Sequence, residues 1–213
     1  MPATVCPYVS RGGLKLAAAL DAFHLDVRGL TCADLGCSTG GFTDCLLQHQ
    51  AAQVHAVDTA YGQFAYKLRQ DPRVRLHERT NALYFDPRSA IPGFPGVDLV
   101  VIDLGWTRQA LALPAALRWL KQAPAAGARI ITLVKPHYEA PAAQTRGARR
   151  GILPDKEAQA ILQTTLAQMP GLGVTVLDQI PSPIRGLSGK TAGNQEFLVL
   201  CQPTGSGTIG TPG

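Results

Sequence analysis

The stretch ADLGCSTGGFTDCLL, residues 33–47, constrains the fold of this 213-residue chain more than any other segment. An apolar run ends at Asp34, glycines follow at positions 36, 40 and 41, and a helical pattern begins near Gly41. Glycines let a backbone take positive φ angles and approach a ligand closely. A strand, a glycine-rich turn and a helix in this order are typical of an α/β fold that binds a ligand at the carboxyl edge of its sheet.

The rest of the chain continues this alternation of short apolar runs and longer amphipathic segments, which indicates a mostly parallel sheet with helices on both faces. We expect seven strands, at 31–35, 53–58, 74–78, 97–103, 128–134, 173–179 and 196–201. We expect helices to begin near Leu14, Gly41, Gly62, Arg108 and Pro154. The pattern predicts one doubly wound α/β domain over residues 1–203 and a disordered tail over 204–213. Two irregular segments, 137–151 and 181–194, are predicted to be substrate loops.

Composition narrows the possible partners. A net charge of +5 and a pI near 9.1 favour a polyanion such as nucleic acid, although many basic proteins bind none. The five cysteines form no C-x-x-C pair, so we expect free thiols, with no disulfide framework and no metal site. The sequence contains no apolar run of about 18 residues and no recognisable targeting signal. We therefore expect a cytoplasmic protein that does not enter a membrane.

The glycine-rich turn predicts a nucleoside site. Its spacing is not G-x-G-x-x-G, which argues against a dinucleotide. Asp34 ends one strand and Asp58 ends the next, where a carboxylate typically binds ribose hydroxyls. S-adenosylmethionine, whose amino-acid end would cross the turn, fits this pattern. Alternatively, Asp34 only caps an ordinary turn, and Asn81, which could lie at the adenine edge, is a plain loop residue.

Three charged residues are predicted to meet beside this site. Asp103 and Lys135 end apolar strands and Glu196 begins the last one, and neighbouring strands lie only about 5 Å apart. A lysine between two carboxylates could donate a hydrogen bond to a substrate hydroxyl or, as a neutral amine, accept its proton. The same residues could equally form structural ion pairs. Lys15, in SRGGLKL, is by its own pattern either a solvated helix charge or part of this chemistry.

Several blocks, SRGGLKL, DLGCSTGGFTDCLL, AVDTAYGQ, LRQDPRV, ERTN, DLVVID, LVKP and GNQEFL, resemble the TlyA group of FtsJ-like RNA 2′-O-methyltransferases, from Tyr8 to Cys201. The resemblance implies a Rossmann-like class I methyltransferase fold and S-adenosylmethionine as cofactor. It also implies a catalytic tetrad of Lys15, Asp103, Lys135 and Glu196. We accordingly predict these cofactor-binding residues: Asp34, Gly36, Ser38, Gly40, Gly41, Phe42, Asp58, Asn81 and Asp103.

The resemblance is incomplete on the substrate side. Family members usually carry an N-terminal S4-type RNA-binding domain that this sequence does not include. Where the family tends to read Ser-Phe-Ile-Ser after the aspartate, this chain has residues 104–107, Leu-Gly-Trp-Thr, and its loop before Asn194 is longer. The predicted substrate-binding residues are Trp106 and Tyr138, which could stack a base, and Arg149, Arg150 and Arg185, which could bind phosphates.

The sequence therefore predicts an S-adenosylmethionine-dependent 2′-O-ribose methyltransferase that acts on RNA, ribosomal RNA in particular. Two alternatives stay open. One is an O-methyltransferase of a small-molecule hydroxyl, and the other is a haemolysin-like or RNA-binding protein without turnover. The sequence leaves the target nucleotide and the oligomeric state open.

Overall fold

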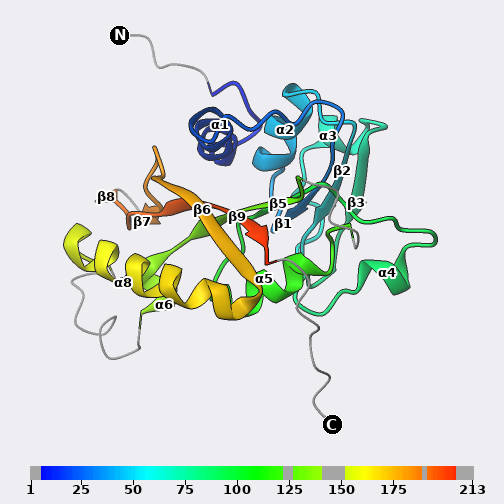
Figure 1. The fold of residues 1–213 in the computed structure, drawn as a ribbon. Helices are drawn as coiled ribbons and strands as arrows, with labels where there is room; N and C mark the ends of the chain where they lie inside the picture. The colour runs from blue at the N-terminus through cyan, green and yellow to red at the C-terminus, as the bar shows by residue number, and fades with distance from the viewer. Residues whose placement is uncertain (1–5, 122–126, 141–151, 189–190, 205–213) are drawn as a thin grey trace.

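A computed structural model describes residues 6–121, 127–140, 152–188 and 191–204 (Figure 1). Within these residues a seven-stranded sheet runs in the order β3-β2-β1-β4-β5-β9-β6. Strands β1 to β5 are parallel, and β9 is antiparallel to both β5 and β6. The strands are β1 (Thr31–Leu35), β2 (Gln53–Val57), β3 (Val74–His77), β4 (Leu99–Ile102), β5 (Arg129–Val134), β6 (Val174–Pro181) and β9 (Phe197–Pro203). The predicted α/β fold with a mostly parallel seven-stranded sheet is confirmed.

Helices cover both faces of this sheet (Figure 1). On one face lie α1 (Gly12–Ala22), α2 (Gly41–Gln48) and α3 (Tyr66–Arg69), and on the other lie α5 (Gln109–Leu117) and α8 (Asp155–Gln168). In β4, Leu99 and Val101 join the core beneath α1 and α2, whereas Val100 and Ile102 join the core beneath α5 and α8. Successive strand residues point to opposite faces, so a strand that is covered on both sides must be apolar throughout.

Some predicted boundaries were wrong. No helix begins near Gly62, because that residue takes a φ of +76° and the helix α3 starts only at Tyr66. Among the described residues, four short elements carry too few residues for a readable periodicity and were not predicted. They are α4 (Pro87–Ala90), α6 (Pro136–Glu139), the 3-10 turn η2 (Met169–Leu172) and the hairpin of β7 (Leu187–Ser188) with β8 (Thr191–Ala192). The hairpin lies within the predicted loop 181–194. Residues 141–151 of the other predicted loop, and 205–213 of the predicted tail, lie outside the described residues.

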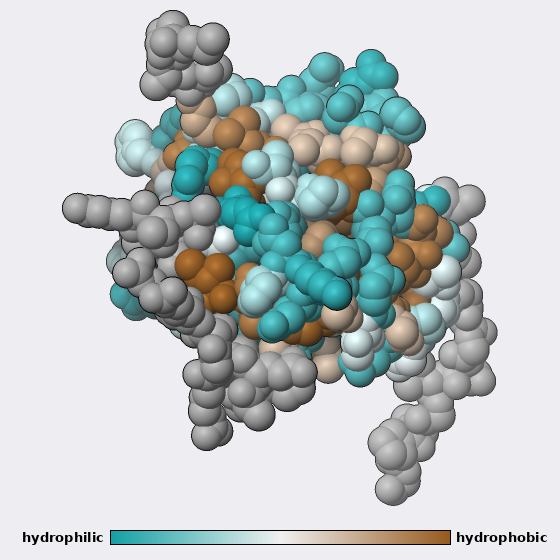
Figure 2. Space-filling view, turned by 90° about the vertical axis from the view of Figure 1, so that its left-hand side faces the viewer, coloured by the Kyte–Doolittle hydropathy of each residue, from teal (hydrophilic) through white to brown (hydrophobic). Residues whose placement is uncertain are grey.

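The outer surface is mixed in character. Figure 2 views the molecule from the left-hand side of Figure 1, and hydrophilic residues cross the centre of that face with hydrophobic patches between them. No helix in the described ranges has the length and hydropathy needed to cross a bilayer. All five cysteines are free thiols, and burial raises the pKa of Cys45 and Cys201 to about 12.

Candidate active site

Two adjoining cavities open around the carboxyl ends of the central strands. One, of about 310 Å³, is lined by Lys15 and Glu196 among others and is called the Lys15 cavity below. The second, of about 490 Å³, is lined by Asp58 and is called the Asp58 cavity. The two share four lining residues, which are Gly36, Ser38, Asp103 and Lys135. A ligand in one cavity therefore lies against the same wall as a ligand in the other.

The shared wall depends on the glycine-rich turn after β1. Gly36 has a φ of +92°, and a Cβ atom there would lie 2.5 Å from the backbone oxygen of Asp103. The Gly36 N–H donates to the Val57 oxygen at 2.9 Å, which fixes the turn against β2 as well. Only glycine combines a left-handed conformation with so close an approach. The turn is thus held directly against the end of β4, where Asp103 begins the next loop.

Asp34 lies behind this turn rather than in either cavity. Its buried carboxylate accepts bonds at Oδ2 from the Thr43 N–H at 3.0 Å and from the Thr43 hydroxyl at 2.7 Å. Burial, reinforced by the charge of Asp103, raises the pKa of Asp34 to about 7. Of the two interpretations of Asp34, the geometry favours the cap: the carboxyl group anchors the first turn of α2.

The neighbouring glycines also serve packing. A Cβ at Gly40, where φ is +101°, would lie 2.5 Å from Cδ1 of Leu68, and a Cβ at Gly41 would collide with the hydroxyl of Ser10. Gly41 and the following Phe42 line the Lys15 cavity, whereas Gly40 lines neither cavity. The turn therefore joins α1, α2 and α3 at one point.

The Asp58 cavity presents a fixed carboxylate. Asp58 accepts bonds from the Ser38 N–H at 2.7 Å and from the Ala60 N–H at 2.8 Å, one at each oxygen. Each carboxylate oxygen has a second lone pair, so this group can still accept two hydroxyls. Asn81 lines the same cavity with an exposed side chain, and its Oδ1 accepts from the Leu83 N–H at 3.0 Å. A rigid acid and an amide at one rim suit the ribose and base of a nucleoside.

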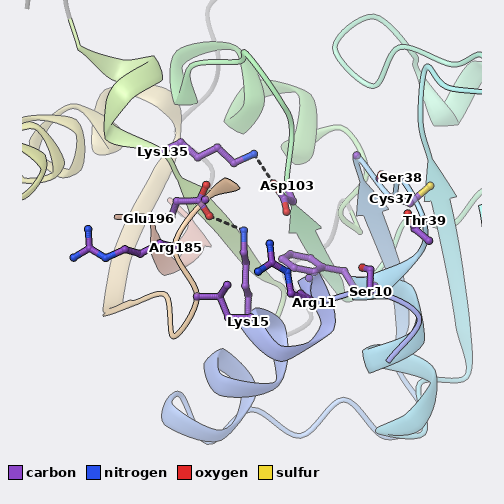
Figure 3. A pocket seen from close by; sticks show the side chains of 16 residues that line it. Ser10, Arg11, Lys15, Cys37, Ser38, Thr39, Asp103, Lys135, Arg185 and Glu196 are labelled. Carbon is purple, nitrogen blue, oxygen red and sulfur yellow. Dashed lines mark hydrogen bonds and ion pairs between the residues drawn. The ribbon is translucent and has the colours of Figure 1, made fainter. Parts of the chain in front are cut away.

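The Lys15 cavity contains two lysine–carboxylate pairs (Figure 3). Lys15 Nζ lies 2.5 Å from Glu196 Oε2, and Lys135 Nζ lies 2.5 Å from Asp103 Oδ1. Both lysine side chains are only 12% exposed. Lys135 also donates to the backbone oxygen of Leu104 at 3.2 Å. The fold brings together four residues from α1, the β4 and β5 ends and the start of β9.

The rim of the Lys15 cavity is basic. Arg11 and Arg185 join the two lysines in its lining, which thus has four cationic side chains against two carboxylates. Arg185 forms a bidentate pair with Asp155, at 2.8 and 2.5 Å, and its side chain extends away from the centre of the cavity in Figure 3. Arg11 was not among the site residues predicted from the sequence. Its position four residues before Lys15, one helical turn away, was the signal that could have found it.

Aromatic residues flank the shared wall. Trp106 lines the Asp58 cavity and is 87% exposed, and its ring centroid lies 5.2 Å from that of Tyr138. Tyr138 lies in α6, which begins directly after Lys135. Arg149 and Arg150 lie outside the described residues, so the structure does not place them. In the described part of the chain, no group of three or more potential metal ligands comes together.

Comparisons with known proteins show which family the chain resembles. The family model of FtsJ-like methyltransferases matches residues 8–201. The chain is 39% identical over 204 residues to "Putative rRNA methyltransferase YqxC" of Bacillus subtilis, covering 95% of this chain and 68% of that protein. It is 43% identical over 183 residues to "16S/23S rRNA (cytidine-2'-O)-methyltransferase TlyA" of Mycobacterium tuberculosis, covering 85% and 65%. The chain thus spans about two thirds of the length of these curated relatives.

A solved structure, "Putative hemolysin from Streptococcus thermophilus", superposes with a TM-score of 0.83 at 38% identity, covering 95% of this chain and 70% of that one. These matches confirm the resemblance to the TlyA group, the class I methyltransferase fold and S-adenosylmethionine as the cofactor. The chain belongs to the FtsJ-like methyltransferase family.

Proposed function

We propose that this chain transfers a methyl group from S-adenosylmethionine to a ribose 2′-hydroxyl of RNA, and that the RNA is ribosomal. One observation carries the proposal: two lysine–carboxylate pairs converge in the Lys15 cavity, whose wall is shared with a cavity suited to a nucleoside. Two relatives are named as rRNA methyltransferases, which supports ribosomal RNA as the substrate.

The cofactor fits the Asp58 cavity. Asp58 would accept the two ribose hydroxyls, Asn81 would lie at the adenine, and the backbone at Gly36 and Ser38 would face the amino-acid end. S-adenosylmethionine, when bound, supplies a methyl group on a positively charged sulfur that leaves as a neutral thioether once the methyl carbon has bonded to an oxygen. Asp34 and Gly40 act indirectly in this proposal, because they hold the turn.

Lys135 is the proposed contact to the reacting oxygen. An ammonium has three N–H donors. Two of them point to Asp103 Oδ1 and to the Leu104 oxygen, so one is left to bind an oxygen in the cavity. There the ammonium can bind and orient the substrate hydroxyl. In the reaction, the neutral amine of Lys135 accepts the hydroxyl proton while the oxygen bonds to the methyl carbon, so that Lys135 ends the step as an ammonium.

Lys15 and Glu196 complete the site from the other side. Their ion pair places the positive charge of Lys15 close to Lys135, and the Glu196 carboxylate balances that charge. Such a charge favours the approach of a substrate phosphate. Arg11 and Arg185 extend the positive surface outward, where RNA phosphates can bind. We also propose that the reaction takes place in the cytoplasm, since all five cysteines are free thiols.

The variant Lys135→Met tests the mechanism, because it removes the charge and keeps the length of the side chain. We expect transfer of labelled methyl from S-adenosylmethionine to ribosomal RNA to fall by at least about 100-fold. Binding of S-adenosylhomocysteine, measured by calorimetry, should survive. Lys121→Met is the matched control, since Lys121 forms an ion pair of the same 2.5 Å length with Asp98 at the opposite end of β4.

Normal turnover in Lys135→Met would overturn the mechanism. Label that enters a small-metabolite extract but no RNA, with the wild-type protein, would overturn the substrate and favour the small-molecule alternative.

A further inference from the structure

The segments that follow Asp103 and Lys135 meet a second time behind the active site. At one end, the Lys135 ammonium forms its 2.5 Å ion pair with Asp103 (Figure 3). At the other end, the loop after Asp103 leads into α5, whose first N–H, at Gln109, donates to Glu139 Oε1 at 2.8 Å. Glu139 is the last residue of α6, the helix that follows Lys135 directly. Two contacts therefore fix the two segments relative to each other.

The second contact consists of bonds in both directions. Arg108 precedes α5 as its N-cap residue, and a guanidinium offers no acceptor to the free N–H groups of that helix. Glu139 supplies the acceptor, and a carboxylate at a helix N-terminus is also favoured by the helix dipole. In return, the Arg108 side chain donates to the backbone oxygens of Tyr138 at 3.2 Å and of Ala140 at 3.4 Å. We call Arg108, Gln109 and Glu139 the interhelix clamp.

The clamp is also anchored to the strand that carries Lys135. The Gln109 side chain is buried, and its Oε1 accepts a bond from the Thr132 hydroxyl at 2.8 Å. Its Nε2 donates to the Leu133 oxygen at 3.4 Å. Both partners lie in β5, whose last residue precedes Lys135. A buried amide that is bonded at both ends resists displacement, because a shift would leave polar groups unpaired.

The clamp lies behind the cavities of the active site. Its three residues line a third cavity, of about 460 Å³. Among the described residues, this cavity shares no lining residue with the two cavities of the active site. Glu139 is therefore not placed to contact a substrate or cofactor bound there. An effect of Glu139 on the reaction has to pass through the positions of Asp103 and Lys135.

We propose that Glu139 is a positioning residue for Lys135, and that the interhelix clamp sets how the Lys135 side chain is held against Asp103. The inference rests on the proposed function, which it deepens by assigning a residue that acts through the reacting lysine. Methyl transfer needs the hydroxyl oxygen, the methyl carbon and the sulfur in line, so a small displacement of Lys135 slows the reaction. The competing role of Glu139 is purely structural, as the cap of α5.

Steady-state kinetics with ribosomal RNA test this assignment. In Glu139→Ala we expect kcat to fall about tenfold, because misplacement of a reacting group costs rate. The KM for RNA and the affinity for S-adenosylhomocysteine should stay nearly unchanged. Glu139→Gln should restore most of the loss, since its amide oxygen can still accept the Gln109 N–H. Burial raises the pKa of the Glu139 carboxyl group, so a neutral side chain of the same length suits this position.

Asp86→Ala is the matched control. The Asp86 carboxylate caps the short helix α4 by accepting bonds from the Arg88 N–H at 3.1 Å and from the Ser89 hydroxyl at 2.6 Å. Loss of either cap should lower the melting temperature by about 3 °C, and only Glu139→Ala should lower kcat. An unchanged kcat in Glu139→Ala, an equal decrease in Asp86→Ala, or no restoration by Glu139→Gln would overturn the positioning role.

Amide hydrogen exchange, followed by mass spectrometry, needs no turnover. In Glu139→Ala we expect faster exchange in both segments, 103–109 and 135–139, and no change there in Asp86→Ala. Faster exchange in 103–109 alone would mean that the contact does not hold Lys135, and it would overturn the proposal. If the wild-type protein methylates no RNA, the proposed function fails, and the exchange measurement still decides whether the clamp holds both segments.

Discussion

Replacing Gly36 by alanine should damage both the fold and the cofactor site. The new methyl group would lie 2.5 Å from the Asp103 backbone oxygen, in a residue held at a φ of +92°. Gly29 offers a matched control. It has a φ of +73°, and a Cβ there would meet nothing within 4 Å. Gly29→Ala therefore isolates the backbone strain, and the difference between the variants isolates the steric contact.

The magnitudes follow from these two contributions. A non-glycine residue in the left-handed region costs about 1 kcal/mol of folding free energy. Forcing an extra carbon into a packed contact costs roughly 2 kcal/mol more. At about 3 °C per kcal/mol for a chain of this size, we expect Gly29→Ala to lower the melting temperature by about 3 °C. For Gly36→Ala we expect a decrease of about 9 °C.

Calorimetric melting with and without S-adenosylhomocysteine is the assay. The ligand should raise the melting temperature of the wild-type protein and of Gly29→Ala. It should have little effect on Gly36→Ala, because relief of the contact moves the turn away from the end of β4. Equal destabilisation of the two variants, with equal stabilisation by the ligand, would refute the conclusion that Gly36 holds the shared wall.

Three further outcomes are expected. The pKa of Asp34 in the folded protein is about 7, whereas the pKa of an aspartate in an unfolded chain is about 3.9. Between pH 4 and 7 the folded protein therefore binds one proton more than the unfolded chain. The contribution of this carboxyl group to the free energy of unfolding then falls as the pH rises through that range. In Asp34→Asn, urea melts at several pH values should lack that decrease. A thiol reagent should modify about one cysteine of the native protein, the half-buried Cys6, and five after denaturation. The variant Asp155→Asn removes the ion-pair partner of Arg185 and frees Arg185 to bind phosphates. The slope of log RNA affinity against log salt concentration should then become steeper by up to about one unit. An unchanged slope would contradict a phosphate contact at Arg185.

The central strands of the sheet could be predicted because they are buried on both faces and almost wholly apolar. Each run, such as 31–35, begins and ends within a few residues of the observed strand. The failure near Gly62 has a local cause. Its left-handed φ breaks a pattern that the neighbouring residues would allow, and a single sequence does not reveal which glycines take that conformation.

Less of the active site than of the sheet could be predicted from the sequence. Strand ends predicted that Asp103, Lys135 and Glu196 lie close together, and the structure places them so. Lys15 required the family resemblance, because nothing in its own helix shows which strand end it meets. The sequence also left two roles open for Asp34. Both a ligand contact and a cap place a carboxylate at the end of β1, and only its bonds to Thr43 distinguish them.

The pair of Lys15 with Glu196 joins residues that are 181 positions apart in the chain. Glu196 precedes β9, the last strand in sequence, which inserts between β5 and β6. In a growing chain on the ribosome, every residue that lines the Asp58 cavity, the last of which is Lys135, is therefore synthesised well before Glu196 of the Lys15 cavity. Contacts between distant parts of a chain are also slow to form. The order of synthesis thus places the residues of the proposed nucleoside site ahead of the last residue of the reaction centre.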